Sequence, residues 1–208
     1  MKPFTSSALA VLVALAASAL VAAARNSSGV ETKLENGQLA SDVSPGVETR
    51  DIVITRVLDA PVEQVWKAWT DPQQVIRWWG PAGFTGCESK IDFREGGRFV
   101  LCMRAPKEFQ DGREFYTAGV YKKIIPMKLI EFTQGLSDKD GNAIDATSMG
   151  MPPDFPKEIP SALAFRRVGN KTELTATEYG WAVGQMREMS EAGLKECIDK
   201  LERLLAGR

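Results

Sequence analysis

The sequence predicts an α+β fold, in which a curved antiparallel sheet of about seven strands wraps around one long C-terminal helix. Two short helices are expected after the first strand. Three observations support this fold. The strand-like segments follow one another as consecutive hairpins, and hairpins build antiparallel sheets. Residues 185–206 carry the longest apolar stripe at helical spacing. The two short helices hold four of the five tryptophans, and so few helical turns need a concave partner to bury them.

The short helices lie within residues 60–84 and are joined by a tight bend. Pro61 suits the first position of a helix, where a missing N–H costs nothing. Apolar residues then recur at helical spacing through Trp69. Asp71 ends this helix and caps the next one, with Pro72 at its first position.

The other elements are strands and one long connection. β-branched residues predict the first strand, and alternation of apolar and polar residues predicts several of the others. The expected strands span residues 47–58, 85–94, 98–104, 114–125, 128–134, 161–168 and 172–179. Residues 137–160 form a proline-rich connection of a length that is often functional, for example as a lid.

The second and third strands are predicted to pair through a three-residue loop at residues 95–97. The resulting register points Cys87 inward and Cys102 outward, so we expect no disulfide between them. We interpret these two cysteines and Cys197 as buried small hydrophobic residues. The predicted pairs are Phe93 with Phe99, Ile91 with Leu101, and Ser89 with Met103.

Composition excludes several classes of function. The chain has no histidine, which excludes Ser-His-Asp and Cys-His nucleophile systems and histidine-ligated metals. Its net charge is −1 and no basic patch stands out, which argues against a nucleic-acid partner. We therefore expect no metal, no cofactor and no nucleic acid.

The first 24 residues have the features of a cleaved secretory signal. Lys2 precedes an apolar segment, and Ala22–Ala24 offers small residues for cleavage. The alternative is an uncleaved membrane anchor formed by residues 8–24, although this run is at the lower end of the ~17–25 residues that span a bilayer. Residues 25–46 are polar and are expected to be a flexible leader. The prediction is thus an exported protein, periplasmic or extracellular, whose single folded domain covers residues 47–206.

Four segments, in order, carry a family resemblance: ITRVLDAPVEQVWKAWTDPQQVIRWWGPAGF, EGGRF, GVYKKIIPMKLIEF and EAGLKECIDKLERLL. They resemble the activator of heat-shock protein 90 ATPase homologue (AHSA-like) branch of the START-like (SRPBCC) superfamily. This resemblance implies a helix-grip fold with a hydrophobic pocket. The family also includes the domain that stimulates the chaperone's ATPase in the eukaryotic co-chaperone. An exported protein meets neither ATP nor a cytosolic chaperone, so we do not expect that activity here.

The favoured hypothesis is non-catalytic binding of a small hydrophobic or amphipathic ligand between the sheet and the last helix. Aromatic and methionine side chains suit an adaptable apolar pocket, although residue by residue a place in the core is the favoured interpretation. The candidate ligand-binding residues are Trp78, Trp79, Phe84, Phe99, Met103, Tyr116, Phe132, Met149, Phe165, Met186 and Met189.

Two alternatives belong to other classes of function. START-like relatives include cyclases and aromatases, and an enzyme of that kind without histidine would have to use tyrosine, carboxylate or arginine groups. The candidates for such chemistry are Arg104, Tyr116, Tyr121 and Glu131. The other alternative is a protein-interaction module of the co-chaperone kind, whose partner the sequence does not name.

Overall fold

The computed structural model describes residues 48–152 and 155–207. The predicted signal segment, the alternative anchor and the leader therefore lie outside the described residues, and export stays a prediction. Among the described helices, none has the length and apolar character needed to cross a bilayer.

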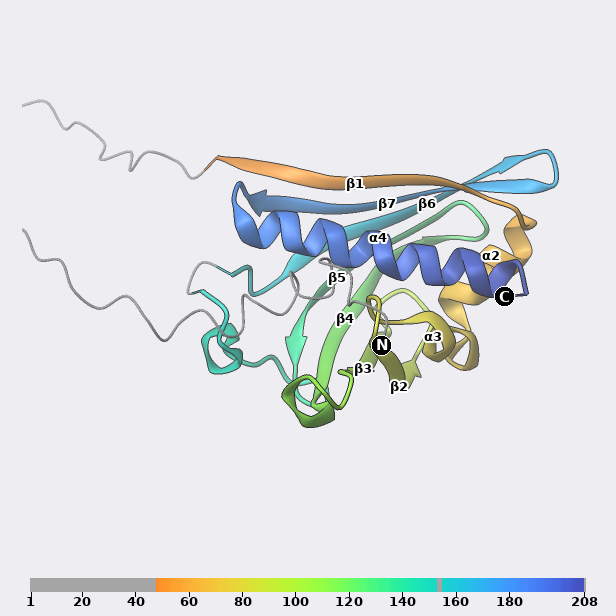
Figure 1. Ribbon diagram of the computed structural model, residues 1–208. Helices are drawn as coiled ribbons and strands as arrows, with labels where there is room; N and C mark the ends of the chain where they lie inside the picture. Colours follow the sequence, from red (N-terminus) through yellow and green to blue (C-terminus); the bar gives the residue numbers. More distant parts are fainter. Residues whose placement is uncertain (1–47, 153–154, 208) are drawn as a thin grey trace, which may run out of the picture.

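Seven antiparallel strands form one sheet in the order β1-β7-β6-β5-β4-β3-β2. Helix α4 lies along one face of this sheet, and helices α2 and α3 lie at the end where α4 terminates (Figure 1). The predicted fold class is confirmed. The elements are β1 (Thr49–Leu58), α2 (Val62–Thr70), α3 (Pro72–Trp78), β2 (Thr85–Ile91), β3 (Arg98–Arg104), β4 (Glu114–Ile125), β5 (Leu129–Ser137), β6 (Ile159–Val168), β7 (Lys171–Ala182) and α4 (Gln185–Leu205), with short 3-10 turns at Gln110–Gly112 and Ala146–Met149.

The bend between α2 and α3 is held by a cap and by tryptophan packing. The Asp71 side chain accepts a hydrogen bond of 2.9 Å from the backbone N–H of Gln73, as an N-cap does. The Trp78 indole N–H donates to the Ala68 carbonyl at 2.9 Å, and its ring meets that of Trp69 edge-on at 4.5 Å. Trp78 is thus fully buried where the two helices meet the sheet.

The predicted register of the β2–β3 hairpin is wrong by two residues. β2 ends at Ile91, which pairs with Phe99, and residues 92–97 form the turn. A backbone hydrogen bond within this longer turn holds it together: the N–H of Gly97 donates to the Arg94 carbonyl at 2.8 Å. Phe93 leaves the strand and packs edge-on against Trp66, with the ring centres 5.7 Å apart.

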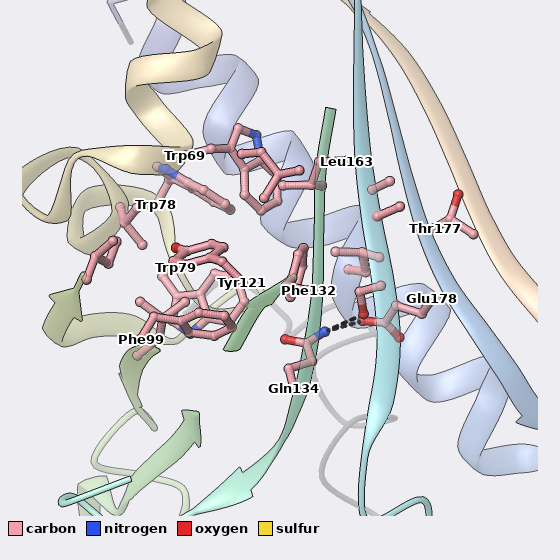
Figure 2. Close-up of a pocket in the computed structure, with 18 residues that line it drawn as sticks. Trp69, Trp78, Trp79, Phe99, Tyr121, Phe132, Gln134, Leu163, Thr177 and Glu178 are labelled. Carbon is pink, nitrogen blue, oxygen red and sulfur yellow. Dashed lines mark hydrogen bonds between the residues drawn. The ribbon is translucent and has the colours of Figure 1, made fainter. Parts of the chain in front are cut away.

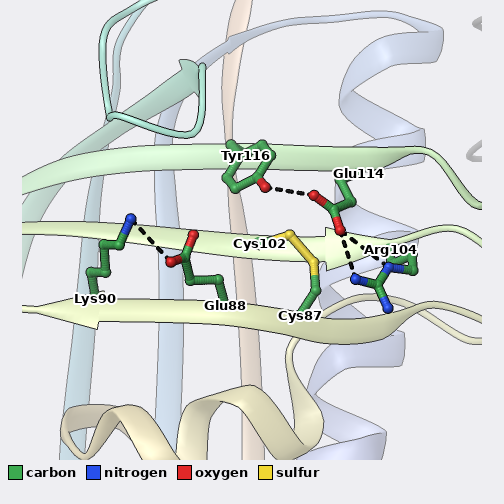
Figure 3. The surroundings of a disulfide bond; sticks show 7 residues. All are labelled: Cys87, Glu88, Lys90, Cys102, Arg104, Glu114 and Tyr116. Atoms are coloured by element: carbon green, nitrogen blue, oxygen red, sulfur yellow. Dashed lines mark hydrogen bonds and ion pairs between the residues drawn. A yellow bond between two sulfur atoms is a disulfide. The ribbon is translucent and has the colours of Figure 1, made fainter.

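The expectation of no disulfide is also wrong, because Cys87 and Cys102 are bonded (Figure 3). The register shifts between Gly86 and Glu88, so one extra residue enters β2 at this point. Such a bulge reverses the inward and outward alternation, which brings Cys87 to the outer face beside Cys102. A Cβ atom at Gly86 would collide with the backbone of Ile76, so α3 packs directly on this part of β2. Cys197 is free and buried, as expected.

Candidate ligand-binding site

A cavity between the sheet and α4 consists of two adjoining compartments. The inner compartment has a volume of about 60 Å³ and lies between the sheet, α3 and the second half of α2. The outer compartment has a volume of about 210 Å³ and lies between the sheet, the first half of α4 and the connection before β6. Both are lined by Trp79, Gln134, Glu178 and Leu194, which therefore form the boundary between them.

Aromatic rings form much of the wall of the inner compartment (Figure 2). Phe99 contacts both Tyr121 and Phe132, with ring centres 5.2 and 5.6 Å apart. Burial raises the pKa of the Tyr121 phenol well above its ordinary value, so this hydroxyl stays neutral. The aromatic residues of this wall are Trp69, Trp78, Trp79, Phe99, Tyr121 and Phe132.

The outer compartment has a more flexible lining. Its walls include Met103 from β3, Met186 and Met189 from α4, and Met151 and Phe155 from the connection. The long, polarisable methionine side chains can adjust to ligands of different shape.

The segment that follows α3 is fastened to α4, which positions Trp79 at the boundary. The Lys200 ammonium donates to the carbonyl groups of Gly80 and Phe84, at 2.8 and 2.9 Å. The N–H of Ala82 donates to the Glu196 carboxylate at 3.0 Å. Lys200 is half-buried, and this burial lowers the pKa of its ammonium group.

Glu178 is the polar centre of the cavity. It lies on β7, is only 8% exposed, and lines both compartments. Its carboxyl group accepts hydrogen bonds from Gln134 Nε2 at 3.1 Å, Trp181 Nε1 at 3.0 Å and Ser190 Oγ at 3.2 Å. Burial raises the pKa of Glu178, and these three neutral donors oppose that effect.

The structure brings seven of the eleven predicted ligand-binding residues to the cavity; their role in binding stays a prediction. These seven are Trp78, Trp79, Phe99, Met103, Phe132, Met186 and Met189.

The remaining four line neither compartment. Phe84 and Met149 pack in a separate cluster around Phe115, and Phe165 lies in the core with its ring edge against Trp66. Tyr116 lies on the outer face, where its hydroxyl donates to Glu114 at 2.6 Å (Figure 3).

Of the four residues considered for acid–base catalysis, only Tyr121 lines the cavity. Arg104 pairs with Glu114 at 2.7 Å on the outer face, beside Tyr116. The hydrogen bond to Glu114 raises the pKa of Tyr116 to about 12. Glu131 lines neither compartment. The four groups therefore do not converge on one site.

Sequence reasoning missed Glu178 and Gln134, although a signal for both was present. On β7 the buried residues Thr172, Leu174 and Ala176 alternate along the strand, and Glu178 continues the same inward series. A charged residue on the apolar face of an alternating strand is unusual and indicates a functional group. Gln134 continues the inward series of β5 in the same way.

Comparison with known proteins identifies the family of the chain. The family model described as Activator of Hsp90 ATPase homolog 1-like protein matches residues 59–206. The chain belongs to this family. No curated protein matches the sequence.

Solved structures of several bacterial proteins share the fold. The solution structure of a protein from Arthrobacter aurescens is 26% identical, with a TM-score of 0.63 over 81% of this chain and 92% of its own. A protein from Nitrosomonas europaea is 24% identical, with a TM-score of 0.58 over 76% of this chain and 94% of its own. The AHSA1 protein from Silicibacter pomeroyi is 19% identical, with a TM-score of 0.57 over 76% of this chain and 98% of its own. The last two show the fold alone. For this family, the helix-grip fold suggests ligand binding or a co-chaperone-like role.

Proposed function

We propose that the protein binds a small hydrophobic or amphipathic ligand, without catalysis, in the cavity between the sheet and α4. The observation that carries this proposal is the aromatic hollow with one polar centre, since apolar pockets with a few convergent polar groups are the usual form of ligand sites.

The size of the cavity limits the ligand. The outer compartment, of about 210 Å³, is smaller than the roughly 300–1,000 Å³ of typical small-molecule sites. The inner compartment adds about 60 Å³ next to it. A ligand built on one or two rings suits this space better than a long acyl chain.

The cysteine chemistry supports export. Disulfides persist in oxidising compartments and are rare in the cytosol. The bond between Cys87 and Cys102 therefore fits a periplasmic or extracellular protein, as the features of residues 1–24 also indicate.

A binding titration with a cavity-filling variant tests the proposal. The neutral hydrophobic dye N-phenyl-1-naphthylamine is added to the purified full chain, and tryptophan fluorescence is followed. We expect a saturable response from the wild type, because four tryptophans line the cavity. Gly193 lines the outer compartment from α4, so Gly193→Leu should fill this space and abolish the response while the helix is retained.

The control is Glu188→Leu, which adds the same side chain at an exposed position of α4 outside the cavity. It should leave the dye response as in the wild type. Absence of a saturable response from the wild type, or an equal response from Gly193→Leu, would contradict the proposed function.

A further inference from the structure

We propose that the ligand carries a protonated primary or secondary amine on an apolar ring, and that the Glu178 carboxylate and the Gln134 amide oxygen bind this amine. This inference rests on the proposed function and names the class of ligand. Three observations carry it: the orientation of Gln134, the open position on Glu178, and the lack of a cation beside that carboxyl group.

The hydrogen bonds of Gln134 fix the orientation of its amide. Ser161 Oγ donates to the Ile159 carbonyl at 3.2 Å, so this oxygen accepts the hydrogen bond of 3.3 Å from Gln134 Nε2. The other N–H of Nε2 donates to Glu178 at 3.1 Å. Both amide hydrogens are therefore used, and Gln134 Oε1 faces away from Glu178, toward the aromatic side chains (Figure 2). Within residues 48–152 and 155–207, this oxygen accepts no hydrogen bond.

Glu178, which is hydrogen-bonded to the amide group of Gln134, offers a second acceptor. Its Oε2 accepts from both Trp181 and Ser190, whereas among the described residues Oε1 accepts from Gln134 alone. Each carboxylate oxygen can accept two hydrogen bonds, so one position on Oε1 is open. In the described part of the chain, Gln134 Oε1 and one position on Glu178 Oε1 thus have no donor, and a ligand that brings two N–H donors can satisfy both.

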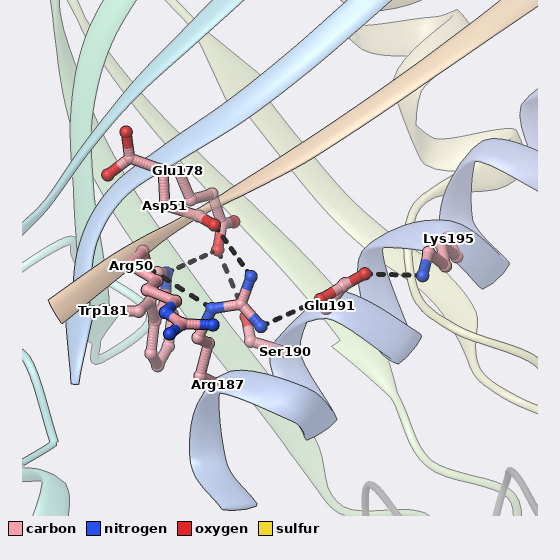
Figure 4. A network of polar contacts seen from close by, with 8 residues as sticks. All are labelled: Arg50, Asp51, Glu178, Trp181, Arg187, Ser190, Glu191 and Lys195. Atoms are coloured by element: carbon pink, nitrogen blue, oxygen red, sulfur yellow. Dashed lines mark hydrogen bonds and ion pairs between the residues drawn. The ribbon is translucent and has the colours of Figure 1, made fainter. Parts of the chain in front are cut away.

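The charge of Glu178 is also unmatched. In the described part of the chain, no lysine or arginine forms an ion pair with it, and all three of its hydrogen-bond donors are neutral. The nearest basic residues of α4 have other partners (Figure 4). Arg187 donates to the carbonyl of Asp51 at 2.8 Å and to Glu191 at 3.1 Å, and Lys195 pairs with Glu191 at 2.6 Å.

A protonated amine matches all three observations. It supplies the missing positive charge and donates two hydrogen bonds, and aromatic faces attract such cations. A hydroxyl group donates only one hydrogen bond and carries no charge. A carboxylate would place further acceptors against Glu178 and Gln134, so fatty acids and aryl acids are expected to bind poorly.

Three ligands of matched size test the inference on the wild-type full chain: 2-phenylethylamine, 2-phenylethanol and phenylacetate, titrated calorimetrically at pH 7.5. We expect the amine to bind at least about tenfold more tightly than the alcohol, a difference of about 1.4 kcal/mol, and phenylacetate to bind most weakly. Equal affinity of the amine and the alcohol would overturn the inference and leave the proposed function standing. If the dye binds and none of the three ligands does, the inference also fails. If neither the dye nor any of the three binds, both proposals fail.

Glu178→Gln tests the role of the charge, since it keeps the shape of the side chain. It should weaken binding of 2-phenylethylamine about tenfold to a hundredfold and change that of 2-phenylethanol by less than about threefold. Glu188→Gln, an exposed change on α4, is the matched control and should change neither. An amine affinity unchanged in Glu178→Gln would overturn the assignment. If that variant does not fold, Gln134→Leu, which removes the second acceptor, should weaken the amine about tenfold, and an unchanged affinity would count equally against the inference.

Discussion

Glu114 and Glu178 are two carboxylates of the same sheet in opposite environments. Glu114 lies at the exposed end of β4, and the hydrogen bonds from Tyr116 and Arg104 lower its pKa. Glu178 lies on the inner face of β7, where no cation of the described residues pairs with it, and burial raises its pKa. The difference shows that the carboxylate on the outer face has a partner of opposite charge within the described chain, whereas the carboxylate on the inner face does not.

The largest expected effect on stability comes from removing the disulfide on the outer face. Cys87 and Cys102 are separated by 15 residues in the sequence, and closing a loop of that length stabilises a fold by about 3 kcal/mol. The double variant Cys87→Ser/Cys102→Ser should therefore lose about 2–3 kcal/mol of unfolding free energy in urea denaturation. Reductant should destabilise the wild type by a similar amount and leave the double variant unchanged. A loss below about 1 kcal/mol would contradict a structural role for the bond.

The next effect concerns the attachment of the cavity wall to α4. Lys200→Met removes the ammonium that holds the carbonyl groups of Gly80 and Phe84, and should cost about 2 kcal/mol, since hydrogen bonds to charged groups contribute about 1.5–3 kcal/mol. Thermal or urea unfolding measures this loss. Lys195→Met is the control on the same helix. It removes only a partly exposed pair with Glu191 and should cost less than about 0.5 kcal/mol. Equal losses in both variants would show that the carbonyl contacts are unimportant.

The dependence of stability on pH sharpens the comparison of the two carboxylates. Because the pKa of Glu178 is higher in the folded state than in the unfolded state, its contribution to stability is lost as the pH rises through the folded value. The wild type should therefore lose stability relative to Glu178→Gln as the pH rises above the ordinary pKa of a glutamate and through the raised folded value. None of the hydrogen-bonding partners of Glu178 titrates in this range. Urea denaturation at several pH values measures the difference, and a flat difference would mean that burial does not perturb this group.

The smallest effect is expected at Glu114, with the opposite sign. Its pKa is lowered in the folded state, so its contribution is present above the unfolded value and is lost as the pH falls through the folded value. Glu114→Gln should thus be slightly less stable than the wild type at pH 7. The difference should be under about 0.5 kcal/mol, because the group is partly exposed. Below about pH 4 the stability of the variant should approach that of the wild type. The same urea series checks this expectation. A difference that grows toward low pH would contradict it.

Local patterns in the sequence predicted the order of the elements well. The limits of β3 and β4 agree with the expected ranges, because both are segments rich in apolar and aromatic residues that lie between clear turn signals. The β2–β3 register could not be found in this way, because a long turn and a one-residue bulge both change it. The bulge lies where Gly86 meets the backbone of Ile76, a contact between two elements that no pattern within one strand reveals.

The candidate site was predicted in composition more than in geometry. Residue type led to Trp79, Phe99 and Met189, which line the cavity. Residue type alone could not separate these from Phe84, which faces a second apolar cluster instead. Glu178 continues the inward series of Thr172, Leu174 and Ala176 on β7, but residue type alone does not assign a carboxylate to an apolar cavity.

The outer compartment owes part of its wall to the connection between β5 and β6, where Met151 lines the hollow and Phe155 also packs edge-on against Trp181 at 5.7 Å. This wall lies outside the hydrogen-bonded ladder of the sheet, so its length and composition can change without altering any strand pairing. Evolution, or protein engineering, can therefore change the size of this compartment by exchanging one loop while the sheet stays the same.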